Sequence, residues 1–169
     1  MDDGCDLLVT EAGARACPVC GERGAPVQLQ TVKALLTEIA LRRVQRTHYR
    51  FCGNTACHVV YFGDARDHFD THDIRVPVWQ KEPIGARLLC YCFGEAESVI
   101  RAELLEDGRS NAADRIREHI AAQRCACDIR NPRGACCLGD VIAAVKRIDS
   151  EIRSWVTRND GAITKLSHR

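Results

Sequence analysis

The residues best suited to chemistry in this sequence are its cysteines. Eleven occur among 169 residues, a fraction above ordinary usage and below that of short disulfide scaffolds. Ten form five close pairs and Cys5 stands alone; the pairs are Cys17/Cys20, Cys52/Cys57, Cys90/Cys92, Cys125/Cys127 and Cys136/Cys137. In a reducing compartment, clustered thiols hold metal ions more often than they pair with one another. We therefore expect metal binding, at two separate sites.

The first site combines the knuckle Cys17-Pro18-Val19-Cys20-Gly21 with Cys52 and Cys57. Four thiolates from two turns suit the closed tetrahedral arrangement of structural zinc, which leaves no position open for water. Two alternatives remain. Cys52 and Cys57 could be buried hydrophobic residues without a metal, and His58 could replace Cys57 as a ligand.

The second site draws on the later cysteines. We expect Cys90-Tyr91-Cys92 to open a helix, where the helix dipole would favour a negatively charged cluster. The remaining pairs are expected to end one helix and begin another across the turn Asn131-Pro132-Arg133-Gly134. Four thiolates from these segments could ligate a [2Fe–2S] cluster.

These motifs resemble a known family. Cys90-Tyr91-Cys92, a long helical stretch, a cysteine before Asn131-Pro132, and Cys136-Cys137 before a helix resemble the bacterioferritin-associated ferredoxin-like [2Fe–2S] domain. With the knuckle at 17–20 and the hydrophobic sequence around Cys52 and Cys57, residues 17–148 resemble the N-terminal zinc and [2Fe–2S] domain of the CopZ copper-chaperone family. The resemblance implies cluster ligands at Cys90, Cys92, Cys127 and Cys137, and a role in handling soft metal ions.

The choice within the last two pairs is positional. Cys137 directly precedes the expected helix from Leu138, whereas Cys125 should belong to the end of the preceding helix and point elsewhere. This leaves Cys125 and Cys136 as spare ligands, inert packing, or a dithiol for Cu(I) or Hg(II), both of which prefer thiolates. The chain has no cysteine after Cys137, so we expect it to lack the family's C-terminal copper-binding domain.

The sequence predicts an α+β protein: a small zinc-ribbon-like α+β unit followed by a helical [2Fe–2S]-binding unit. The predicted divisions are a lead-in at 1–16, a zinc-binding unit at 17–80, a linker at 81–89, a helical unit at 90–158 with a long C-terminal helix, and a tail at 159–169.

Hydrophobic spacing predicts the elements that position these cysteines. Residues 32–39 have helical spacing, 48–51 and 59–62 read as strands, and 74–78 alternate as a half-buried strand would. The histidines and aspartates of 64–73 favour a solvated acidic loop. Helices are expected over 95–106, 111–123 and from Leu138, with their apolar faces inward; Val141, Val145, Ile148, Ile152 and Trp155 recur at steps of four and three.

Composition excludes several classes of function. The net charge is +1 and aromatic residues make up 5%, so nucleic-acid binding is disfavoured. No apolar run could cross a bilayer, and the acidic start argues against a signal peptide, which predicts a cytoplasmic protein. No phosphate-binding loop, catalytic triad or helix-borne carboxylate pair is present, so we expect no independent catalytic site, although the cluster could reduce a metal ion.

The sequence and its resemblance therefore predict a cytoplasmic one-electron transfer module serving copper or mercury handling. The expected partner is a metal-handling protein or an electron donor or acceptor protein. Two other hypotheses remain: a metallochaperone that binds Cu(I) through its spare cysteines, and a redox-sensing regulatory or scaffold protein. The long last helix offers a route to a homodimer.

Overall fold

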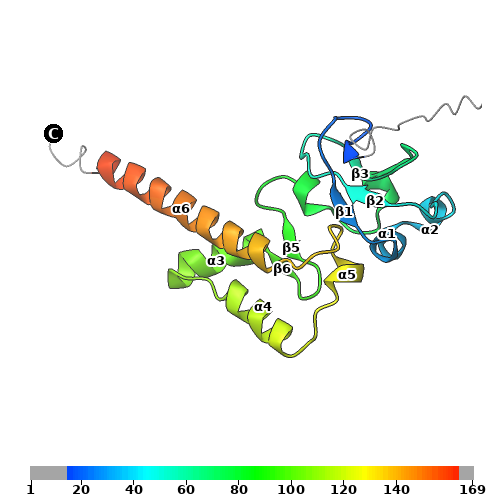
Figure 1. Cartoon of the computed structure of the whole chain (residues 1–169). Helices are drawn as coiled ribbons and strands as arrows, with labels where there is room; N and C mark the ends of the chain where they lie inside the picture. Colours follow the sequence, from blue (N-terminus) through cyan, green and yellow to red (C-terminus); the bar gives the residue numbers. More distant parts are fainter. Residues whose placement is uncertain (1–14, 164–169) are drawn as a thin grey trace, which may run out of the picture. The chain divides into compact units, whose positions relative to one another are not determined.

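The computed structural model describes residues 15–163, and the chain divides into two compact units (Figure 1). The first unit runs to Lys81 and also includes Asp128–Gly134; the second comprises Glu82–Cys127 and the chain from Ala135 onward. The mixture of helices and antiparallel strands confirms the predicted α+β class. Nearly all of the lead-in at 1–16, including Cys5, and the end of the tail beyond Ile163 lie outside the described residues.

An antiparallel four-stranded sheet forms the centre of the first unit. Its strands are β1 (Ala25–Val27), β2 (Tyr49–Phe51), β3 (Val59–Gly63) and β4 (His68–Asp70), in that spatial order. The predicted strands at 48–51 and 59–62 are confirmed as β2 and β3. All five residues of β3 are buried, as a central strand covered on both faces requires. The interpretation of 64–73 as an acidic loop misses β4.

Two short helices cover this sheet. The predicted helix over 32–39 is two helices, α1 (Leu29–Leu35) and α2 (Glu38–Leu41), because the chain is extended at Leu36 and Thr37. The side chain of Thr37 caps α2 by accepting a hydrogen bond from the Ala40 N–H. Ile39, expected on the inner face, is therefore 77% exposed. The buried core joins helix and sheet residues: Val32, Leu35, Leu36, Ala40, Tyr49, Phe51, Val60, Tyr61, Phe69, Ile74 and Val78.

The strand expected at 74–78 does not form. Its only ladder contact among the described residues is an isolated bridge between Leu36 and Ile74, and two 3₁₀ helices flank it, η2 (Thr71–Asp73) and η3 (Trp79–Lys81). Pro77 has no N–H to donate to a sheet. The alternating apolar residues instead anchor an irregular segment, since Ile74 and Val78 are buried in the core.

Within the described residues, the second unit consists of a small hairpin and three main helices. Strands β5 (Leu88–Cys90) and β6 (Glu95–Ala96) pair antiparallel. They are followed by α3 (Glu97–Asp107), α4 (Ala112–Ala121) and α6 (Leu138–Ile163), while the short α5 (Cys127–Arg130) spans the division between the units. The predicted end of α3 is confirmed, because Gly108 adopts a left-handed conformation with φ of 68°.

The helices of the second unit bury only part of the apolar set expected inside. Ile100, Leu104, Ile116, Val141 and Ile148 are buried. Val99, Leu105 and Ile120 are exposed, contrary to the sequence interpretation. The helix α6 begins at Leu138 as predicted and continues to Ile163, past the expected end at 158, so that its last turns extend beyond α3 and α4 (Figure 1). Trp155, expected on its inner seam, is 62% exposed.

No helix within residues 15–163 combines the length and apolarity that a membrane span requires.

Candidate metal centres

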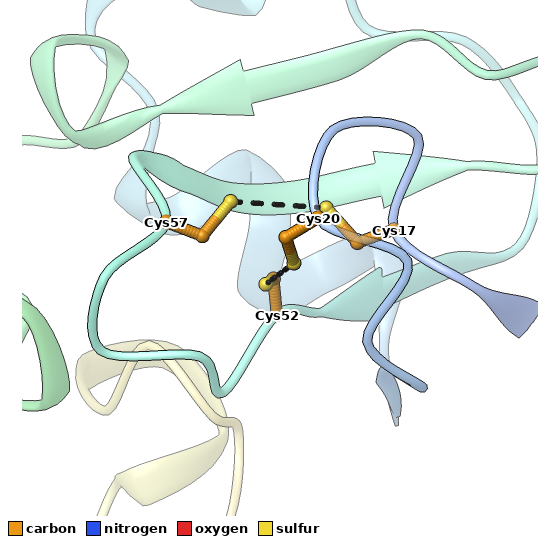
Figure 2. Close-up of side chains that lie close together, drawn as sticks. All are labelled: Cys17, Cys20, Cys52 and Cys57. Carbon is orange, nitrogen blue, oxygen red and sulfur yellow. Dashed lines mark hydrogen bonds between the residues drawn. The ribbon is translucent and has the colours of Figure 1, made fainter.

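The four cysteines of the first group converge at one point of the first unit (Figure 2). Cys17 and Cys20 lie on the turn before β1, Cys52 follows β2, and Cys57 precedes β3. Their sulfur atoms all lie within 4.8 Å of one another. The Cys17 and Cys57 sulfurs are 3.9 Å apart, and those of Cys20 and Cys52 are 3.6 Å apart. The chain thus forms one compact set of four thiols.

This geometry fits a single zinc ion. Zinc–sulfur bonds of about 2.3 Å in a tetrahedron place the sulfurs about 3.8 Å apart, close to the separations of 3.9 Å and 3.6 Å in the two pairs. Cys17, Cys52 and Cys57 are buried together with Val59 and Phe62, and only Cys20 is exposed. His58, the alternative ligand, is exposed and is not a member of the group.

Hydrogen-bonded turns position the four cysteines of the first group. Gly21 has φ of 75°, and its N–H donates to the Cys17 carbonyl at 2.9 Å, which closes the first knuckle. In the second turn, the Asn54 carbonyl accepts from the Cys57 N–H at 3.2 Å, and its Oδ1 accepts from the Ala56 N–H at 2.9 Å. Sequence reasoning missed Asn54, although Gly53-Asn54 is a turn signal. The asparagine accommodates the wide spacing between Cys52 and Cys57.

The thiols of the first group differ in acidity. Burial opposes ionisation of Cys20, but hydrogen bonds from the Glu22 backbone and the neighbouring thiols lower its pKa to about 7. Burial raises the pKa of Cys52 and of Cys57. Cys20 therefore loses its proton first, and Cys52 and Cys57 keep theirs until a cation replaces them.

The second group lies in the second unit and forms two close pairs rather than one compact set. The Cys92 and Cys127 sulfurs are 3.9 Å apart, and Cys90 and Cys137 share a thiol hydrogen bond. Among residues 15–163, no group that includes these four draws all its sulfurs within 4.8 Å. A binuclear cluster takes two thiolates at each iron, so a two-plus-two arrangement of donors fits that group better than it fits one zinc ion.

The elements that carry the second group differ from those expected. Cys90 ends β5 and Cys92 lies in the turn that follows, whereas α3 begins only at Glu97. The expectation that this pair opens a helix, near its positive end, is therefore wrong. Cys125 lies beyond α4, which ends at Ala121, and so it does not belong to that helix. Cys137 directly precedes α6, as expected, and its carbonyl accepts from the Val141 N–H at 3.0 Å.

The acidity of the second group is also uneven. The hydrogen bond from Cys137 lowers the pKa of Cys90 to about 6. The same bond, together with burial, raises the pKa of Cys137. Burial and the charge of Cys92 raise the pKa of Cys127 to about 12. Cys90 is therefore the preferred thiolate, and Cys127 and Cys137 require a metal cation to ionise at neutral pH.

The two remaining cysteines of this unit are Cys125 and Cys136, which differ in exposure. Cys136 is exposed and Cys125 is half-buried, whereas the neighbouring Cys137 is buried. The chain between Cys125 and Cys127 contacts the hairpin, because the Ala126 N–H donates to the Cys92 sulfur at 3.4 Å. Burial raises the pKa of Cys125.

The sequence analysis did not predict an ion-pair network that lies beside the hairpin. Arg115 on α4 donates to both carboxylate oxygens of Glu95, which directly follows the Cys90–Gly94 turn, and also to Glu103 on α3. The sequence carries no signal for these contacts, because the partners are 12 and 20 residues apart.

Comparison with known proteins defines the class. Residues 14–75 match the family model of a zinc-binding domain, the CopZ type, and this range contains all four cysteines of the compact set. The match and the geometry together support zinc binding by the first unit. Residues 14–75 are therefore similar to the CopZ-type zinc-binding domain.

A solved structure extends the likeness beyond the first unit. The chain is 26% identical to the N-terminal domain of CopZ from Archaeoglobus fulgidus, determined by X-ray crystallography; the match covers 72% of this chain and 91% of that one with a TM-score of 0.60. No curated protein matches the chain. The predicted resemblance to the CopZ N-terminal domain is confirmed.

Proposed function

We propose that this chain is a zinc- and [2Fe–2S]-binding protein that transfers single electrons to a metal-handling partner. The observation that carries the proposal is the contrast between one compact set of four thiols and a second set of two close pairs. The likeness to the CopZ N-terminal domain supports a link to copper.

In this proposal Cys17, Cys20, Cys52 and Cys57 hold a structural zinc ion. Four thiolates complete its coordination and leave no position for a substrate. The ion joins the turn before β1 to the loop between β2 and β3, and so contributes to the folding of a unit that has only short strands.

Cys90, Cys92, Cys127 and Cys137 are the proposed cluster ligands. When bound, a [2Fe–2S] cluster takes up and releases one electron. The buried Cys90 and Cys137 shield one side of the set, while Cys92 and Cys127 are only half-buried. Electron exchange with a donor or acceptor protein is thus proposed through the Cys92 and Cys127 side.

The test is metal analysis and absorption spectroscopy of protein purified without oxygen. The proposal predicts one zinc and two irons per chain, with visible absorption that bleaches on reduction. Zinc without iron, even after anaerobic reconstitution, would exclude the cluster and with it the electron-transfer role.

A second candidate function is transfer of Cu(I) or Hg(II) by the spare cysteines. Its support is the accessibility of Cys136 and the partial exposure of Cys125, since soft ions prefer thiolates. Titration of cluster-loaded protein with Cu(I) tests it: a carrier binds one extra ion without losing iron, and Cys125→Ser or Cys136→Ser abolishes that binding. Reduction of a bound metal ion by the cluster would give the same site reductase activity.

A third candidate is a redox-sensing regulatory or scaffold protein. The exposed Trp155 near the end of α6 supports it, because a partner or a second copy of the chain could cover that face. Pull-downs with oxidised and reduced protein, and the mass of the protein in solution, test the partner and the homodimer respectively. A cytoplasmic location is part of all three proposals, because free thiols persist in reducing compartments.

A further inference from the structure

The turn that carries Cys90 and Cys92 has little backbone support of its own. Strand β5 has three residues and β6 has two, and isolated two-stranded hairpins are marginally stable. The turn closes through a hydrogen bond from the Gly94 N–H to the Cys90 carbonyl at 2.9 Å, with Gly94 at φ of 75°. Side-chain contacts must therefore fix its position.

Glu95 supplies the strongest of these contacts. It pairs with Cys90 across the hairpin, and its side chain is only 8% exposed. Arg115 on α4 holds both of its oxygens, with Nε to Oε1 at 2.6 Å and Nη2 to Oε2 at 2.8 Å. This bidentate geometry fixes orientation as well as distance.

The arginine is itself held in place. Its Nη1 donates to Glu103 Oε1 at 2.5 Å. The other oxygen of Glu103 accepts from the Ser110 hydroxyl at 2.5 Å and from the Asn111 N–H at 3.1 Å. The network thus ties the hairpin to α3, α4 and the turn that joins them.

We propose that Arg115 is a positioning residue for the second cysteine group: through Glu95 it holds the Cys90–Gly94 turn in the arrangement that receives the [2Fe–2S] cluster. It also neutralises a buried carboxylate beside Cys90, whose charge would otherwise add to that of the thiolates. The role rests on the proposed function, although the hold on the turn exists without the cluster. Arg115 acts through Glu95 and has no contact with the sulfurs among those described.

The experiment compares three variants of the full chain. Arg115→Gln removes both the positive charge and the pair of hydrogen bonds to Glu95. Arg115→Lys keeps the charge but cannot form that bidentate pair. Arg117→Gln is the matched control, because Arg117 lies one half-turn away on α4 and pairs only with the exposed Asp114 among the described contacts. In iron-free protein, the alkylation rate of Cys90 is measured by mass spectrometry. In reconstituted protein, the rate of iron loss to a chelator is measured, and the electron paramagnetic resonance spectrum is recorded after reduction.

Arg115→Gln is expected to raise the alkylation rate of Cys90 at least tenfold, a change of about 1.4 kcal/mol in local opening. It should also speed iron loss and alter the resonance spectrum. Arg115→Lys should recover part of each effect, and Arg117→Gln should match the unaltered protein.

The outcomes separate the two proposals. Unchanged alkylation of Cys90 in Arg115→Gln overturns the positioning role. A lower melting temperature with alkylation equal to the Arg117→Gln control also overturns it, since the residue would then be merely structural. Failure of the unaltered chain to bind iron overturns the proposed function, while the alkylation comparison still decides whether Arg115 holds the turn.

Discussion

The cysteines of the two groups are brought together by different kinds of structural element. The first draws on two turns beside one sheet, and its sulfurs lie within 4.8 Å of one another. The second joins a hairpin turn, the start of a short helix and the residue before a long helix, and it gathers as two pairs. Small turns thus form a closed set for one ion, whereas helix starts and a hairpin form a wider set, which we propose receives the two irons of one cluster.

The largest expected difference between the groups concerns folding. Replacing Cys17 with serine should remove zinc and unfold the first unit, because zinc contributes on the order of 10 kcal/mol in small sites. The second unit should keep its helices and the iron that we propose it binds. Metal analysis with circular dichroism checks this, with Cys136→Ser as the control because that thiol is exposed and outside the set. Unchanged thermal stability of Cys17→Ser would argue against a structural site.

Replacing cysteines of the second group should change the visible absorption of the protein and leave the fold of the first unit unchanged. Cys127→Ser and Cys137→Ser are expected to lose the visible absorption of the cluster, because each breaks one of the two close pairs. Cys125→Ser and Cys136→Ser should keep it, and absorption spectra of the four reconstituted variants provide the measurement. The reverse pattern would identify Cys125 and Cys136 as the ligands.

The next expected effect is a dependence of zinc affinity on pH. Thiols must lose protons to bind zinc, so the zinc-free first unit holds more protons than the zinc-bound one and affinity rises with pH. The pKa of Cys20 is about 7, and those of Cys52 and Cys57 are raised. Between pH 8 and pH 6 the affinity should fall by at least a hundredfold, since more than one thiol regains its proton. Competition with a chelator measures it; an affinity independent of pH would mean that the thiols are not the ligands.

Local signals predicted the first group better than the second. The knuckle at 17–20, the strands around Cys52 and Cys57, and the glycine end of α3 each depend on a few neighbouring residues, and the structure has them where the sequence placed them. The resemblance to a known domain correctly joined these pieces. Such features need no knowledge of distant contacts.

The errors occurred where pairing and packing override the local hydrophobic pattern. Cys90-Tyr91-Cys92 resembles a helix start because helix-forming residues follow it, but pairing of Cys90 with Glu95 makes a hairpin there instead. The alternation at 74–78 suggests a strand, yet Pro77 and the core contacts of Ile74 favour an irregular segment. The bidentate hydrogen bonds from Arg115 to Glu95 depend on how α4 packs beside the hairpin, and no local sequence pattern predicts that packing.

The smallest expected effect contrasts two glycines, one from each unit. Gly134 in the first unit and Gly108 in the second have nearly the same conformation, with φ of 64° and 68°. A Cβ on Gly134 would lie 2.9 Å from the Thr31 hydroxyl oxygen, whereas a Cβ on Gly108 would meet nothing within 4 Å. Thr31 is fully buried and cannot easily move away.

Alanine at Gly108 should therefore cost only the left-handed backbone, about 1 kcal/mol. Gly134→Ala should lower the free energy of unfolding by about 2–3 kcal/mol, because the close contact with Thr31 adds to the backbone strain. Denaturant unfolding of zinc-loaded protein, monitored separately by zinc release for the first unit and by helical circular dichroism for the second, measures both changes. Equal losses for the two variants would mean that the chain around Thr31 relaxes freely, and that the 128–134 segment is not tightly packed against the rest of the first unit.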